Sequence, residues 1–413
     1  MKFYIDNFRG IQEQFIDLQN VTFLVGENSS GKTSLMRAID LLSDFNFLMN
    51  GEISSEDKDF YSFDDLISAN RTSDSFSLGL AEEKDQMIEI LSFNNEDGLP
   101  KCSRVVLFIK EHLIVLYFKK SYFEYGIKPN VAFNDVTQNL SKIDNLMTDV
   151  VFKKEEILSR VPFPIYLHFL APKDRIVRGI YKDLEKIPFF SLMPCLFEAP
   201  IRAKPQNIYS GAKKSYTADG LHTPFVIKNA LKEKNDKIKF LRKFGKESGL
   251  FDDIRTTIYG DNNSAPFELI VEKDGSEFSI SSVGYGVSQI LPIVVDMIFA
   301  GEPMILIQQP EVHLHPRAQA AFGEFVFNIS QYDQNRKFVI ETHSDYIIDR
   351  YRYCVKKSID KRKNSGQIFF MQHQNGYNSI QVIPFNSEGG YECDDMVEYR
   401  KFFIDESLKI MEC

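Results

Sequence analysis

Residues 26–33, which read GENSSGKT, have the residue types and the spacing of a phosphate-binding loop. Glycines let backbone N–H groups curl around a phosphate at a helix N-terminus, where the helix dipole favours negative charge. The ammonium of Lys32 would reach the β- and γ-phosphates, and the hydroxyl of Thr33 would bind Mg²⁺. The predicted nucleotide-binding residues are Asn28, Ser29, Ser30, Gly31, Lys32, Thr33 and Ser34. The loop therefore predicts ATP and Mg²⁺ as ligands.

The elements on either side of the loop support this assignment. Residues 21–25 are β-branched or apolar and predict a buried strand. After the loop, Leu35, Ala38, Ile39 and Leu42 recur at helical spacing. A strand followed by the loop and a helix is the context that confirms this motif, and the alternative is a chance glycine-rich turn.

Three further motifs follow in a fixed order in the last third of the chain. They are SVGYGVSQ at 282–289, QQPEVHLHP at 308–316 after an apolar strand, and ETHSD at 341–345 after another apolar strand. Each motif is weak by itself, so their meaning depends on the combination with the phosphate loop.

Taken together and in this order, the motifs resemble those of AAA-family, ABC-type ATPases of the SMC, RecF and OLD kind. The chain more closely resembles stand-alone ATPases of bacterial antiphage defence systems, such as the ATPase halves of OLD nucleases and the PtuA ATPase of Septu systems. The segments NFRGI at 7–11, QPEVHLHPRAQ at 309–319 and ETHSDYII at 341–348 carry this likeness. It covers residues 1–50 and 280–350 well and the middle of the chain poorly.

The resemblance implies a role for residues of each motif. Ser282 and Gly284 would form the signature that binds the γ-phosphate across a dimer interface. Gln308 stands where the Mg²⁺-supporting Walker B carboxylate is expected, so Thr33 and Gln308 are the predicted metal-site residues. Gln309 stands where many relatives have the catalytic glutamate, and His343 would contact the γ-phosphate.

Gln308 is a departure from the pattern that the resemblance implies. A neutral amide supports neither a metal's charge nor proton transfer as well as a carboxylate. Glu311 is the nearest remaining carboxylate and could polarise the attacking water; Glu341 is another candidate. Two explanations fit: a slow ATPase that uses ATP mainly as a dimerising ligand, or a Glu→Gln substitution that traps the ATP state.

Two of these motifs also have ordinary interpretations. Glu311, His313 and His315 are metal-ligand residue types, but zinc ligands are expected at other spacings, and the resemblance places both histidines in the D-loop. Ser282 alone would be an ordinary turn serine, because Ser and Gly dominate turns.

Composition and charge narrow the class of protein. A net charge of −9 excludes a basic nucleic-acid coat, so any nucleic-acid contact must be a local patch. Five cysteines without a C-x-x-C pair favour a reducing compartment over a disulfide framework or a zinc finger. We expect a cytoplasmic protein without a membrane span, because we find no signal peptide and no run of about 18 apolar residues.

The candidate patch is the segment from Lys228 to Lys246. It contains eight Lys or Arg residues and only two acidic residues, Glu233 and Asp236. Charged residues at helical spacing usually form a solvated helix face. The alternative is a surface for nucleic acid or for a partner protein.

The expected fold is α/β, with a mostly parallel sheet that carries the motif loops at its strand ends. Turn signals predict two hairpins, one at Glu111 and His112 and one at Asn375 and Gly376. The expected ATPase domain comprises residues 1–134 and 266–413, including an antiparallel β lobe at about 75–130 and a terminal helix over 398–413; residues 135–265 would form a mainly helical insertion.

The function expected from the motifs and the resemblance is that of an ATP-binding, ATP-hydrolysing homodimer or higher oligomer. It would sense nucleic acid or an invader and control a separate effector, a nuclease, since the 70 residues after His343 are too few for an average domain. The alternatives are a RecF- or SMC-like DNA-repair clamp without an effector and the ATPase of a membrane transporter.

Overall fold

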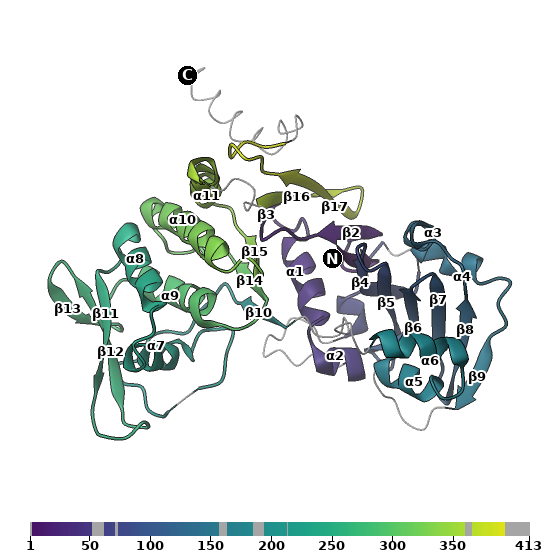
Figure 1. Ribbon diagram of the computed structural model, residues 1–413. Coiled ribbons are helices and arrows are strands. Elements are labelled where there is room, and N and C mark those ends of the chain that lie inside the picture. Colours follow the sequence, from purple (N-terminus) through teal and green to yellow (C-terminus); the bar gives the residue numbers. More distant parts are fainter. Residues whose placement is uncertain are drawn as a thin grey trace, which may run out of the picture. The chain divides into compact units, whose positions relative to one another are not determined.

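The computed structural model describes residues 2–51, 62–70, 73–156, 163–184, 194–212, 214–359 and 366–392. These residues form two compact units, whose helices and strands Figure 1 labels. Unit 1 comprises the described residues of Met1–Leu18, Ser29–Met193 and Gln372–Ser379, and unit 2 those of Gln19–Asn28, Pro194–Met371 and Ile380–Cys413. The terminal helix expected over 398–413 lies outside the described residues.

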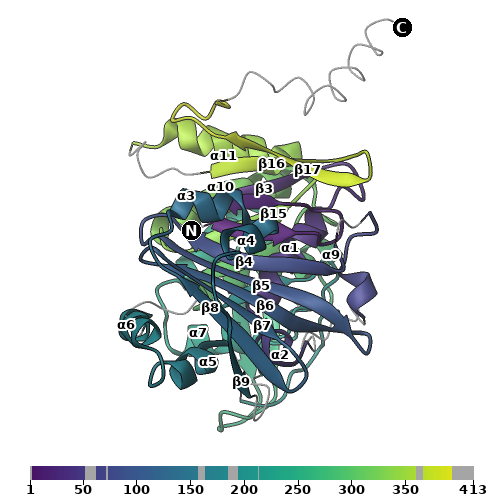
Figure 2. The same cartoon turned by 90° about the vertical axis from the view of Figure 1, so that its right-hand side faces the viewer.

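Unit 1 is built on an eight-stranded antiparallel sheet, and Figure 2 shows its strands β4 to β7 side by side. In spatial order the strands are β2 (Gln14–Asp17), β1 (Lys2–Asp6), β4 (Ser75–Glu82), β5 (Met87–Glu96), β6 (Leu99–Ile109), β7 (His112–Phe118), β8 (Tyr122–Lys128) and β9 (Lys153–Glu156). The antiparallel lobe predicted at about 75–130 is confirmed, and β1, β2 and β9 extend it.

The turn of the β6–β7 hairpin shows how local backbone conformation determines the pairing of two strands in this sheet. Its turn residues Lys110 and Glu111 have φ angles of 47° and 64°. Positive φ at both central residues is the type I′ geometry, whose twist matches that of the flanking strands. The predicted hairpin is confirmed, but the turn begins one residue earlier than expected because His112 pairs with Ile109 in the ladder.

The remaining elements of unit 1 are helices. They are α1 (Lys32–Leu41), α2 (Phe45–Asn50), α3 (Phe133–Gln138), α4 (Ile143–Leu146), α5 (Phe163–Leu170) and α6 (Arg175–Leu184), with 3₁₀ turns at Phe63–Asp65 and Leu140–Lys142. Alternate strand residues such as Ile88, Phe108 and Val115 share one buried cluster with Val136 and Ile143 of α3 and α4. The period of two along each strand therefore places one face of the sheet in the core.

Unit 2 contains the mostly parallel sheet that the sequence predicts. Its strands, in spatial order, are β10 (Cys195–Glu198), β14 (Met304–Gln308), β15 (Lys337–Glu341), β3 (Val21–Gly26), β16 (Gly366–Gln374) and β17 (Tyr377–Pro384). The first five strands are parallel to one another. Strands β14 and β15 have apolar, buried centres, residues 304–307 and 338–340, which suit strands of a parallel sheet that is covered on both faces.

Helices α7 (Thr223–Lys232), α8 (Ile238–Ser248), α9 (Tyr285–Phe299), α10 (Pro316–Tyr332) and α11 (Asp345–Lys357) also belong to unit 2. Figure 1 shows a second, three-stranded antiparallel sheet beside α7 and α8. Its strands are β11 (Asp253–Ile258), β12 (Phe267–Lys273) and β13 (Ser276–Ser279). One continuous apolar core runs from Phe23 and Ile307 of the parallel sheet to Val294, Phe325 and Phe267.

The predicted α/β class with a mostly parallel sheet and an antiparallel lobe is confirmed by this topology. The stretch 135–265 contributes helices to both units, together with the short strands β9, β10 and β11. The domain boundaries proposed from the sequence stay a prediction. Within the part of the chain that the structure describes, no helix is long and apolar enough to cross a membrane.

Candidate nucleotide site

The phosphate loop has the predicted context of strand, loop and helix. Strand β3 of unit 2 ends at Gly26, and α1 of unit 1 begins at Lys32. Gly26, Ser29 and Gly31 all have positive φ, at 147°, 63° and 94°. A Cβ at position 31 would lie 2.5 Å from the side-chain nitrogen of Asn378, so both backbone conformation and space require glycine there.

The side chains of this loop differ in exposure. Glu27, Asn28 and Ser29 are exposed, whereas Lys32 is buried with 4% of its surface accessible. The hydroxyl of Ser30 is also buried, and among the described residues it has no hydrogen-bond partner. A buried hydroxyl without a partner costs free energy, and a bound phosphate oxygen would remove that cost. The loop therefore fits a bound phosphate group.

The parallel register of unit 2 brings three predicted segments to one edge of its sheet. Gln308 at the end of β14 pairs with Glu341 at the end of β15, and Glu341 pairs with Leu24 near the end of β3. The first residues of the phosphate loop, the 308–316 segment and the 341–345 segment therefore leave the same edge. Ligands of open α/β sheets bind at the carboxyl ends of the strands.

Gln308 is buried and has a carboxylate beside it. Its Nε2 donates a hydrogen bond of 3.2 Å to Oε2 of Glu341, and the backbone N–H of Gln309 donates to the carbonyl of Glu341 at 2.9 Å. The neutral amide at position 308 thus lies next to a charge on the neighbouring strand. Sequence reasoning named Glu341 only as a second choice, because its distance from Gln308 depends on strand register.

Glu311 links the two loops at this edge. Its Oε2 accepts a 2.8 Å hydrogen bond from the hydroxyl of Thr342, and its Oε1 accepts a 2.7 Å bond from the backbone N–H of His343. The carboxylate therefore holds the segment that carries the exposed His343 ring. A role of Glu311 in polarising water stays a prediction, and it would require Glu311 to exchange one of these bonds.

The predicted signature lies at the start of α9. Gly284 caps the helix, and Ser282 and Gly284 are both exposed. The ring of Tyr285 contacts that of His313 edge-on at 4.7 Å, and a Cβ at Gly286 would lie 2.8 Å from the His313 carbonyl. The helix start and the 308–316 segment are therefore packed together within unit 2.

The metal-site alternative for Glu311, His313 and His315 is not supported. Across the described ranges, no group of three His, Cys, Asp or Glu side chains is placed to hold a metal ion. His315 instead caps α10, where its Nδ1 accepts a 3.3 Å hydrogen bond from the backbone N–H of Arg317.

Arg202 contacts the predicted site residue Gln308, a contact that sequence reasoning missed. It is 2% exposed, and its Nη2 donates a 2.9 Å hydrogen bond to the main-chain carbonyl of Gln308. No local signal could have identified it, because Arg202 lies in an irregular basic segment more than 100 residues before its partner.

A buried cluster of titratable groups lies on β10 and the neighbouring helices. The pKa of Glu198 lies well above its usual range, mainly because the residue is buried and also because the Asp296 carboxylate is nearby. Burial raises the pKa of Asp296 to about 7. Nε2 of His222 lies 2.9 Å from Oδ1 of Asp296, while its Nδ1 accepts a bond from the backbone N–H of Thr217. That second bond requires the neutral ring, and burial accordingly lowers the pKa of His222.

The basic stretch is not one uniform face. Lys228 is buried beneath the ring of Phe267 and donates to two backbone carbonyls, and Arg242 pairs with Asp253 at 2.6 Å. The exposed lysines Lys239, Lys243 and Lys246 follow one side of α8 at helical spacing. A nucleic-acid contact of the Lys228–Lys246 region stays a prediction.

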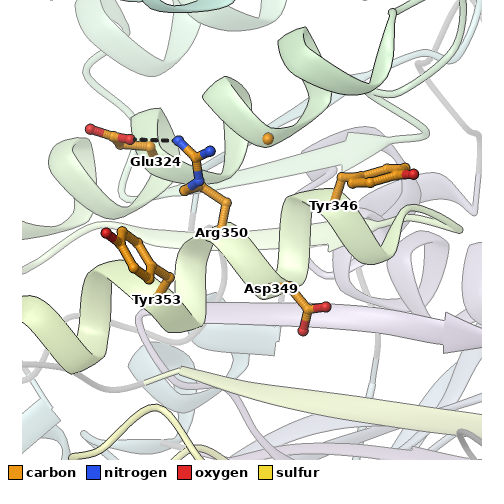
Figure 3. Close-up of a pocket in the computed structure, with 6 residues that line it drawn as sticks. Glu324, Tyr346, Asp349, Arg350 and Tyr353 are labelled. Carbon is orange, nitrogen blue, oxygen red and sulfur yellow. Dashed lines mark hydrogen bonds and ion pairs between the residues drawn. The ribbon is translucent and has the colours of Figure 1, made fainter.

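A surface pocket of about 540 Å³ lies between α10 and α11 (Figure 3). Its lining residues are Ala320, Glu324, Tyr346, Asp349, Arg350 and Tyr353. Arg350 and Glu324 neutralise each other across it through a 3.1 Å ion pair. None of the predicted nucleotide-binding residues lines this pocket.

Comparisons with known families match two parts of the chain. A family model described as "AAA ATPase domain" matches residues 1–162. A second, described as "AAA domain, putative AbiEii toxin, Type IV TA system", matches residues 202–349. The first match includes the phosphate loop and the second includes all three later motifs. Together they support an ATP-binding protein of the ATPase class.

Solved structures similar to this chain include SMC head domains. One is the SMC head bound to the C-winged helix domain of ScpA, at 14% identity and a TM-score of 0.43, covering 93% of this chain and 97% of that one. Another is the SMC head domain from Thermotoga maritima, at 11% identity and a TM-score of 0.38, covering 92% and 97%. No curated protein matches the chain.

Proposed function

We propose that this protein is an ATP-binding, ATP-hydrolysing dimeric switch of a bacterial antiphage defence system. In this proposal it senses nucleic acid or an invader and controls a separate effector, a nuclease. The observation that carries the ATP-binding part is the phosphate loop, with its left-handed backbone, its buried Lys32 and the unsatisfied hydroxyl of Ser30. The defence role is supported by the resemblance of the motifs and by the toxin named in the description of the family model over residues 202–349.

Within this proposal each motif residue has a task. Residues 28–34 would hold the phosphates of ATP, and Thr33 and Gln308 would hold Mg²⁺; Glu341 lies beside Gln308. The metal would neutralise phosphate charge and polarise the bond to the γ-phosphate. Gln309, Glu311 and His343 would orient the attacking water and the γ-phosphate. Because Gln308 carries no charge, turnover in this chain should be slow.

Dimerisation is proposed from the exposure of the signature. Ser282 and Gly284 lie at the start of a 15-residue helix, where backbone N–H groups and the helix dipole favour an anion. The γ-phosphate on a second copy of the chain would supply that anion. ATP that binds the closed pair better than the single chain stabilises the pair by mass action.

Replacing Ser282 with Arg should therefore abolish ATP-dependent dimerisation, because it places bulk and charge at the contact. Light scattering with ATP and Mg²⁺ should give twice the mass of one chain for the unmodified protein and a single mass for Ser282→Arg. The control is Ser276→Arg, which adds the same side chain to an exposed serine of β13. If both variants dimerise equally, the proposed interface is wrong.

The alternative, a repair clamp without an effector, predicts DNA binding by the protein itself. The exposed lysines of α8 then contact phosphates, and reversing Lys239, Lys243 and Lys246 to Glu should lower the salt slope of log affinity by roughly 2.7, about 0.9 for each lost contact. A salt titration with duplex and single-stranded DNA measures this slope. Unchanged binding after the reversal supports a solvated helix face instead.

A further inference from the structure

Arg202 contacts the carboxyl end of strand β14, at the edge of the unit 2 sheet where the motif segments begin. Its guanidinium donates to two main-chain carbonyls, with Nη2 2.9 Å from the oxygen of Gln308 and Nη1 3.2 Å from that of Pro200. The carbonyl of Gln308 is the last of strand β14, so Arg202 holds the point at which this strand becomes the 308–316 segment.

The charge of Arg202 is retained in this buried position. Burial lowers its pKa to about 10, while Glu198 and Glu311 oppose that decrease. Glu198 is on β10 and pairs in register with Ile307, next to Gln308, but burial raises its own pKa well above the usual range. A buried charge needs compensating partners, and here they are the carbonyls of Gln308 and Pro200 and the Glu311 carboxylate in the segment that Arg202 holds.

The backbone of Arg202 is tied to a different motif. Its N–H donates to Oε1 of Gln289 at 3.3 Å, and its carbonyl accepts from Nε2 of the same residue at 3.4 Å. Gln289 is buried in the second turn of α9, the helix that begins directly after Gly284. One residue therefore connects the signature helix to the end of β14.

We propose that Arg202 is a positioning residue of the nucleotide site, which fixes the segment after Gln308 relative to the helix of the signature. This inference rests on the proposed function. In a dimer, Gln308 would face the nucleotide bound by its own chain and Ser282 the nucleotide of the partner. Arg202 thus links the two composite sites through a guanidinium and one glutamine side chain.

Arg336 provides a matched control. It is also buried, at 6% exposure, and it also donates to two main-chain carbonyls, those of Met297 at 2.8 Å and Ala300 at 2.5 Å. These carbonyls lie at the other end of α9, and Arg336 directly precedes the first residue of β15. Replacing either arginine with Met removes hydrogen bonds to two main-chain carbonyls, and Arg336→Met also removes an ion pair with Asp333 at 3.4 Å.

The test is hydrogen exchange of the full chain without nucleotide. In Arg202→Met, amides of Gln309, Val312 and Leu314, which bond within or beside this segment, should exchange about tenfold faster or more, since bonds to charged groups are the stronger ones. Arg202→Lys keeps the charge and should restore part of the protection. Arg336→Met should accelerate exchange near residues 300 and 337 and leave the 309–314 amides unchanged.

A second readout separates positioning from stability alone. In the Gln308→Glu background, Arg202→Met should lower kcat for ATP several-fold with KM within about twofold, and Arg336→Met should change neither. Equal effects of the two Met variants on the 309–314 amides or on kcat would overturn the proposal. Because the exchange experiment contains no ATP, its outcome stands even if the chain proves not to bind ATP, a failure that calorimetric titration of the unmodified chain with ATP reports separately.

Discussion

Replacing Gln308 with Glu should raise the rate of ATP hydrolysis roughly a hundredfold, the lower end of the range for gaining a positioned acid–base group. Gln308 Nε2 lies 3.2 Å from a Glu341 oxygen, so the substitution places two carboxylates side by side. Like charges at this distance do not both ionise unless a cation lies between them. The variant should therefore bind Mg²⁺ more tightly and hydrolyse ATP in a strongly Mg²⁺-dependent manner.

Phosphate release, measured beside light scattering, checks this expectation, because faster hydrolysis should also shorten the lifetime of the dimer. Gln309→Glu is the variant for comparison, since it adds a carboxylate one residue away, where the resemblance implies the catalytic glutamate and the backbone has a positive φ of 41°. If Gln309→Glu alone accelerates hydrolysis, position 309 carries the catalytic carboxylate. If the unmodified chain is already as fast as Gln308→Glu, then Gln308 does not lie at the metal position.

Replacing Lys32 with Ala should weaken ATP binding tenfold or more. The ammonium of Lys32 is largely removed from solvent, and hydrogen bonds to charged groups contribute about 1.5–3 kcal/mol. Lys228 is an equally buried lysine at 3% exposure, but it serves carbonyls of the 211 and 263 loops in unit 2. Lys228→Ala should therefore leave ATP affinity unchanged, whatever it costs in stability.

Features set by neighbouring residues could be predicted from the sequence. The strand, loop and helix around residues 26–33 follow from apolar periodicity and from glycines at positions of positive φ. The hairpin at Asn375 and Gly376 has φ angles of 53° and 85°, as its residue types imply. The apolar runs at 304–307 and 338–340 predicted the parallel pairing of these two strands, because such runs suit strands that are covered on both faces.

Contacts between distant residues could not be predicted. Gln308 and Glu341 are 33 residues apart, and only the strand register brings them together. Arg202 lies 106 residues before Gln308, and no local pattern links the two residues. Lys228 belongs to the basic segment predicted from the sequence, yet it is buried against Phe267. A long lysine side chain can pack its aliphatic stem against apolar groups while its ammonium donates to carbonyls.

A calorimetric titration of ATP with Mg²⁺ into the unmodified chain, Lys32→Ala and Lys228→Ala tests the central claim most directly. The account predicts one binding site per chain, with affinity at least tenfold weaker in Lys32→Ala and unchanged in Lys228→Ala. No binding by the unmodified chain, or equal affinity in Lys32→Ala, would contradict it.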